Sequence, residues 1–166
     1  MKHMVMKIIS GGQTGADRAT LDFAIRHNIP YGGWIPKGRK AEDGRLPDHY
    51  QLQKMPTGEY LKRTEQNILD SDGTLIGSHG RLTGGSVLTR EFAKTQMRPC
   101  IHVDMEDTAM DDAAKQVKAW VERKHIQVLN VAGPRTSKDP KIYDVTMSLL
   151  ESVWFSEWKE ETYEHI

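Results

Sequence analysis

Short apolar runs alternate with amphipathic segments along most of this chain, and that alternation constrains the fold more than any other feature. Runs of this length are typical of buried strands, and apolar residues at helical spacing indicate helices between them. The predicted strands span 4–9, 31–35, 72–77, 99–103 and 126–133, and the predicted helices span 16–27, 59–69, 86–96 and 111–124, with a last helix that begins at Asp139–Pro140. We therefore expect one α/β domain over residues 1–166, a Rossmann-like three-layer sandwich of about five mostly parallel strands with helices on both faces.

The composition argues against several classes of protein. The chain has 23 Lys+Arg and 23 Asp+Glu, and no basic tail or stripe supports nucleic-acid binding. Cys100 is the single cysteine, so a disulfide within the chain is excluded and a reducing compartment fits. No apolar run approaches the roughly 20 residues of a membrane span, and the histidines lack metal-ligand spacing. We expect a cytoplasmic protein with neither membrane nor nucleic-acid partners and no protein-bound metal.

The first glycine-rich segment, SGGQTGAD at residues 10–17, lies between a predicted strand and a predicted helix. Glycines let a ligand approach the backbone, and the start of a helix presents unpaired N–H groups and the positive end of its dipole. The pattern is neither a Walker loop nor G-x-G-x-x-G, so its spacing fits a phosphate site and a capped turn about equally. The candidate ligand-binding residues here are Ser10, Gly11, Gly12, Gln13, Thr14, Gly15 and Asp17.

A second glycine-rich segment, GSHGRLTGGSVLTREFA at residues 77–93, also joins a strand to a helix. Two helix N-termini at the carboxyl edge of one parallel sheet indicate a shared ligand crevice. This repetition favours a phosphate site over two unrelated turns. The candidate residues are Gly84, Gly85, Ser86 and Thr89. Glu91 either stabilises the start of the helix or reaches the pocket.

Basic residues near these loops are candidates for binding an anion. Arg135 lies in a third strand-to-helix loop. From the sequence it is about equally expected to bind an anion or to be a solvated surface residue. Lys37 and Arg39 lie in a long segment, 32–53, and structureless segments of that length are usually functional or disordered. Arg63 shares one helix face with Asn67. That face points either to solvent or into the crevice.

Four stretches of the chain resemble one known family. SGGQTGADRATLDFAI, GGWIPKGRKAEDGRLP, YLKRTEQNILDSDGTLI and TGGSVLT resemble, in this order, the bacterial family named "putative molybdenum carrier proteins", within the SLOG superfamily of Rossmann-like nucleotide-binding proteins. The resemblance spans residues 5–155. It implies ligand binding at the glycine loops and a homo-oligomer. The word carrier implies the molybdenum cofactor, a molybdopterin-type phosphorylated pterin, or a nucleotide as the bound ligand, with molybdenum arriving on the cofactor's own sulfurs.

The same superfamily contains phosphoribohydrolases, which release a base from a nucleoside monophosphate. Their P-G-G-x-G-T-x-x-E signature resembles residues 83–91, where Gly84, Gly85 and Glu91 match but Thr83, Val87 and Leu88 depart from it. Their catalytic arginine falls on Arg63. The resemblance therefore implies an alternative function, nucleotide hydrolysis with Arg63 and Glu91 as catalytic residues.

A third hypothesis treats both glycine loops as turns and the chain as an assembly module. The large apolar residues near its end, Trp154, Phe155 and Trp158, then form either an interface or part of the core.

Overall fold

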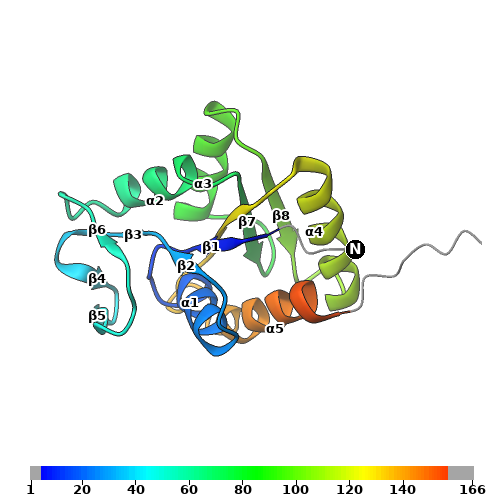
Figure 1. The fold of residues 1–166 in the computed structure, drawn as a ribbon, viewed down its shortest axis with the longest axis horizontal. Helices are drawn as coiled ribbons and strands as arrows, with labels where there is room; N and C mark the ends of the chain where they lie inside the picture. Colours follow the sequence, from blue (N-terminus) through cyan, green and yellow to red (C-terminus); the bar gives the residue numbers. More distant parts are fainter. Residues whose placement is uncertain (1–4, 157–166) are drawn as a thin grey trace, which may run out of the picture.

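The computed structural model describes residues 5–156 and is built on a five-stranded parallel sheet with the order β2-β1-β9-β7-β8 (Figure 1). The strands are β1 (Lys7–Ile9), β2 (Tyr31–Gly32), β7 (Gly73–Ser78), β8 (Cys100–Asp104) and β9 (Val128–Ala132). In the register, Ile8 of β1 lies opposite Tyr31 on one side and Leu129 on the other. Strand β7 pairs with β8 and β9, again in parallel. The predicted sheet is confirmed.

Within residues 5–156, five α-helices cover the two faces of the sheet. They are α1 (Ala16–Arg26), α2 (Tyr60–Leu69), α3 (Gly84–Thr95), α4 (Met110–Lys124) and α5 (Ile142–Phe155). Helix α5 packs against both α1 and α4 on one face, whereas α2 and α3 pack together on the other (Figure 1). The result is the predicted three-layer arrangement, which parallel sheets require because both of their faces must be buried.

The two faces of the sheet differ in chemistry. The main core lies under α1, α4 and α5, where Phe23, Val117 and Leu150 pack over Ile8 and Leu129. Each such side chain contributes about 1.5–3 kcal/mol by leaving water. Helix α2 instead buries two polar side chains, those of Arg63 and Asn67, beside Ile68. The α2–α3 face therefore has room for a polar site.

The segment predicted as one strand over 31–35 is divided, and that prediction is wrong. Gly33 breaks it with φ of +130°, and a Cβ added there would stand 2.2 Å from the carbonyl oxygen of Ser10. The chain turns after β2 and enters β3 (Trp34–Ile35), which pairs with β6 (Gln53–Lys54) in a small separate sheet. Between them lie a 3-10 turn (Lys37–Arg39) and a short hairpin of β4 (Lys40–Ala41) with β5 (Gly44–Arg45). The long segment 32–53 is thus ordered, and we call it the arm.

The last helix begins at Ile142 rather than at the predicted Asp139. The Asp139 side chain accepts the N–H of Lys141 at 3.0 Å, and this local hydrogen bond holds a turn ahead of the helix. Its other carboxylate oxygen lies 2.6 Å from Nδ1 of His79. Asp139 therefore orients a neighbouring loop instead of continuing the helix.

Candidate functional site

A cavity of about 780 Å³ opens at the carboxyl ends of β1, β7 and β9. The chain leaves β1 toward β2 on one side and β7 toward β8 on the other, so the cavity lies where the strand order reverses, as expected for ligand sites of open parallel sheets. Of the residues predicted from the sequence, those that line it are Gly11, Gln13, Asp17, Arg63, Gly84, Gly85, Ser86, Thr89 and Arg135. The three strand-to-helix loops thus meet at one site.

The first loop uses its own backbone N–H groups. Gly12 N–H donates to the Ser10 hydroxyl at 3.3 Å. Gln13 N–H donates to the Asp17 carboxylate at 3.2 Å, and Thr14 N–H donates to the Gln13 amide oxygen at 3.0 Å. An anion-binding loop needs such groups unpaired. This loop therefore positions the Asp17 and Gln13 side chains at the cavity instead of offering those three N–H groups to a phosphate.

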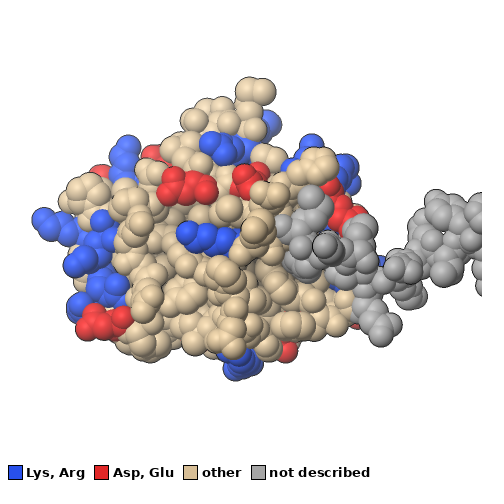
Figure 2. All heavy atoms as spheres, in the orientation of Figure 1, with Lys and Arg blue, Asp and Glu red and all other residues tan. Residues whose placement is uncertain are grey.

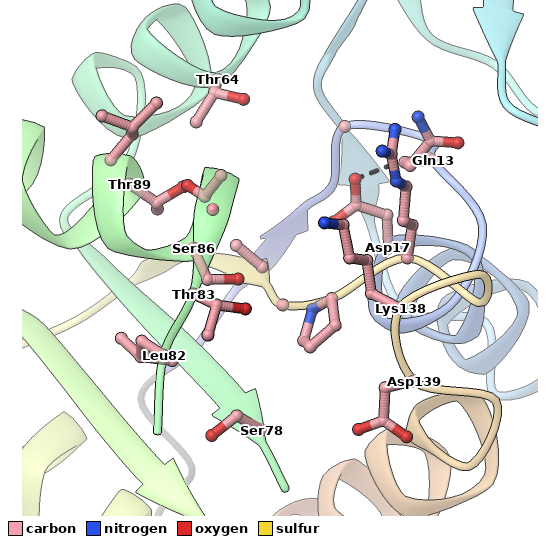
Figure 3. Close-up of a pocket in the computed structure, with 18 of the residues that line it drawn as sticks. Gln13, Asp17, Thr64, Ser78, Leu82, Thr83, Ser86, Thr89, Lys138 and Asp139 are labelled. Atoms are coloured by element: carbon pink, nitrogen blue, oxygen red, sulfur yellow. Dashed lines mark hydrogen bonds between the residues drawn. The ribbon is translucent and has the colours of Figure 1, made fainter. Parts of the chain in front are cut away.

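The start of α3 is open by contrast. A Cβ added at Gly84 or at Gly85 would have no atom within 4 Å, and the Thr83 side chain makes no capping hydrogen bond. Within residues 5–156, no hydrogen bond engages the N–H groups of these two glycines. Thr83 and Ser86 lie on one side of the cavity, opposite Asp17 (Figure 3). The open N–H groups and hydroxyls make this end of α3 suited to an anion.

Arg63 and Asp17 are opposite charges in the buried part of the site. The Arg63 side chain, 6% exposed, donates from Nη1 to the Gly11 carbonyl and from Nε to Thr64 Oγ1 at 3.3 Å. Burial lowers its pKa, an effect that the charge of Asp17 opposes. Burial also raises the pKa of Asp17 to about 6, although Arg63 acts against this. Perturbed groups of this kind in a cleft are typical of functional sites.

Glu42, on the arm, ties the first loop to the third. Its carboxylate accepts hydrogen bonds from the Thr14 hydroxyl and from Ser137, through N–H at 3.0 Å and Oγ at 2.5 Å. Arg135 Nε lies 3.4 Å from the same carboxylate. The Glu42 N–H donates in turn to the Gln13 amide oxygen at 2.8 Å. The arm therefore fixes the rim of the cavity, and Arg135 is already partly neutralised.

The remaining predicted residues lie outside the cavity lining. Four residues of the first loop do not line the cavity: Ser10, Gly12, Thr14 and Gly15. At Gly15 the loop packs closely on the third loop, because a Cβ there would stand 2.4 Å from the Pro134 carbonyl oxygen. Arg39 is 7% exposed and donates to three carbonyls of the arm, whereas Lys37 is exposed to solvent. Glu91 is exposed on α3. Phe155 is 57% exposed, Trp154 packs edge-on against Phe23, and Trp158 lies outside the described residues.

Sequence reasoning did not assign some cavity residues to the site. They include Thr64, Asn130, Arg81, Lys138 and Asp139. Asn130 is 3% exposed within β9, in a run that is typical of an ordinary buried strand, so only its polarity there was a signal. His79, inside the second glycine loop, also lines the cavity with its ring nitrogen on Asp139.

Comparisons with known proteins show which proteins this chain resembles in sequence and in fold. The model of the Circularly permutated YpsA SLOG family matches residues 8–154. A crystal structure of the "putative molybdenum carrier protein" from Syntrophus aciditrophicus SB is 62% identical in sequence, covers 93% of this chain and 98% of that one, and superposes with a TM-score of 0.91. A search of curated proteins gave no match. The resemblance inferred from the sequence motifs is confirmed.

The described residues offer neither a metal site nor a membrane-spanning helix. No group of three or more His, Cys, Asp or Glu side chains among them is placed to hold a metal ion. In the same part of the chain, no helix is long and apolar enough to cross a membrane. Figure 2 shows lysine, arginine and acidic side chains interspersed on the face it presents.

Proposed function

This chain belongs to the Circularly permutated YpsA SLOG family, and we propose on that premise that it is a molybdenum-cofactor carrier or binding protein that holds a phosphorylated pterin or a nucleotide in the cavity. The name of the 62%-identical protein supports the molybdenum assignment. In this proposal the metal is cargo and remains on the sulfurs of its own cofactor.

The observation on which the proposal rests is the open start of α3 inside a cationic cavity. A volume of about 780 Å³ falls in the range of small-molecule sites. The positively charged lining residues are Arg63, Arg81, Arg135, Lys138 and Lys141, against two carboxylates, Asp17 and Asp139. The ligand phosphate binds at the free N–H groups of Gly84 and Gly85 and at the Ser86 hydroxyl, where the helix dipole also favours negative charge.

The hydrolase alternative has weaker support. Nucleotide hydrolysis by Arg63 and Glu91 requires both side chains in one pocket, because an acid or base must reach the reacting atoms. Arg63 lines the cavity, but Glu91 is exposed and does not. We therefore favour binding and delivery over hydrolysis.

Self-association, which the family resemblance implies, stays a prediction. Leu61 and Leu88 at the cavity are 44% and 52% exposed and are candidates for a contact surface between copies of the chain.

Native mass spectrometry of freshly purified protein, followed by calorimetric titration with nucleoside monophosphates and molybdopterin-type pterins, tests the proposal. Gly85→Val fills the space that the phosphate needs, and a Cβ there meets no neighbouring atom. We expect this variant to lose at least tenfold in affinity while it melts within a few degrees of the parent. Gly58→Val, outside the cavity lining, is the control, and a Cβ there meets only the flexible end of the Lys40 side chain. Absence of any bound or titratable pterin or nucleotide would overturn the function.

A further inference from the structure

In the buried wall of the cavity, each of two charged side chains, Arg63 and Asp17, has one polar atom that no hydrogen bond from the described residues engages. Arg63 engages Nη1 and Nε, and within the described residues no hydrogen bond engages Nη2. Asp17 accepts the Gln13 N–H on Oδ2, and none of the described residues donates to Oδ1. No ion pair joins the two side chains in that part of the chain. Both line the cavity, and both are more than nine-tenths buried.

These open positions specify what a ligand presents at this wall. A ligand that fills the cavity excludes water from these two atoms, and polar atoms left there without partners would be costly. The bound ligand is therefore expected to supply an acceptor for Arg63 and a donor for Asp17. A phosphate would satisfy Arg63, but its charge would face the Asp17 carboxylate. The end of the ligand that reaches this wall therefore carries neutral donors beside an acceptor.

We propose that Arg63 and Asp17 recognise the 2-amino-4-oxo ring edge that guanine and pterins share, with the ring inward and the phosphate at the start of α3. The inference rests on the proposed function and names its ligand class. The ring carbonyl accepts from Arg63, and the ring N–H and amino group donate to the two Asp17 oxygens, since a carboxylate has lone pairs for both.

Other residues at the wall fit a flat, partly polar ring. Tyr60 lines the cavity, and its ring lies 5.6 Å from the guanidinium carbon of Arg63. Adenine in the same orientation turns its amino donor toward Arg63 and its ring-nitrogen acceptor toward the Asp17 carboxylate, so neither side chain gains a complementary partner. Hypoxanthine keeps the carbonyl and the ring N–H but lacks the amino group, so Asp17 receives one hydrogen bond from the ring instead of two. The wall is thus built to prefer guanine and pterin over both.

Calorimetric titration with GMP, IMP and AMP tests this at pH 7.5, because the three share one phosphate and differ only in the ring. We expect GMP to bind about tenfold or more tighter than IMP and AMP, because each of these two lacks at least one hydrogen bond to the charged Asp17 carboxylate. Asp17→Asn keeps an oxygen for the Gln13 N–H but loses the second acceptor, so the GMP preference should fall to about threefold or less. Asp144→Asn, at an exposed carboxylate of α5 outside the cavity lining, should keep it.

The outcomes separate this inference from the function on which it rests. Equal binding of the three nucleotides, or an equal loss for all three in Asp17→Asn, overturns the ring assignment and leaves the carrier function standing. Failure of every nucleotide and pterin to bind overturns both. Thermal melting of both variants in each buffer confirms that they are folded.

Discussion

Replacing Asp17 by asparagine should stabilise the folded protein at neutral pH. In the folded chain the pKa of Asp17 is raised from 3.8 to about 6, first because burial disfavours its charge. Arg63 on α2, Arg18 on α1 and the Gln13 N–H favour the charge but only reduce the shift. Between about pH 4 and 6 the folded state therefore binds more protons than the unfolded state, and stability falls as the pH rises through this window. The asparagine side chain of the variant does not titrate and escapes that loss.

The size of the effect follows from the shift of about two pKa units. At about 1.4 kcal/mol per unit, the wild-type protein loses up to about 3 kcal/mol relative to Asp17→Asn between pH 4 and pH 7. Urea denaturation of both proteins at pH 4, 5, 6, 7 and 8 measures the difference in unfolding free energy, in which the titration of all other groups cancels. We expect the difference to move in favour of the variant across this range and to level off above pH 7.

Asp43→Asn provides a control of opposite sign. The hydrogen bond from Arg18 lowers the pKa of Asp43, so its contribution to stability is present above the ordinary pKa and is lost as the pH falls. That variant should lose stability at pH 7 and lose less near pH 3. A free-energy difference between wild type and Asp17→Asn that stays constant from pH 4 to pH 8 would refute the raised pKa, and with it the burial argument.

Two further changes test the arm. Glu42→Ala removes the carboxylate that joins Thr14 and Ser137. We expect the free energy of unfolding to fall by about 1–3 kcal/mol and trypsin to cleave the arm faster in limited proteolysis. Unchanged cleavage would mean that other contacts hold the arm. Arg39→Met removes the donor to three carbonyls and, among the described residues, leaves those of Leu46 and Tyr50 without any. It should lower the free energy of unfolding by about 2–4 kcal/mol in urea denaturation, against about 0.5 kcal/mol or less for the exposed Lys37→Met; equal losses would contradict the structural role of Arg39.

The fold was largely predictable because its periodic signals are strong. Apolar faces such as that of α4, with Ala113, Val117 and Val121, repeat over several turns and admit one interpretation. The arm was not predictable, because its strands are two residues long and pair with segments that local spacing does not reveal. Gly33 gave no sign that it breaks a strand, since the obstacle is the Ser10 carbonyl from another part of the chain.

The site was predictable in position but less so in detail. Glycine-rich loops at the ends of predicted strands located the cavity, because carboxyl ends of parallel strands share one edge. Whether a loop N–H is free depends on the side chains around it, and spacing does not show that Ser10, Gln13 and Asp17 occupy three of them. Sequence also does not separate a buried arginine that supports backbone, Arg39, from one that faces a cavity, Arg63.

The carboxylate that faces Arg63 shows why position in the fold outweighs position in a motif. Alignment of the second glycine loop pairs Arg63 with Glu91, yet α3 turns Glu91 to solvent. The first turn of α1 instead places Asp17 in the cavity, where the charges of the two groups act on each other. An exposed carboxylate changes the stability of the fold little, whereas a buried one lowers it at neutral pH. A buried carboxylate is tolerated where a ligand completes its hydrogen bonds. The stability lost at Asp17 is therefore itself an argument that the ligand ring, and not its phosphate, reaches this wall.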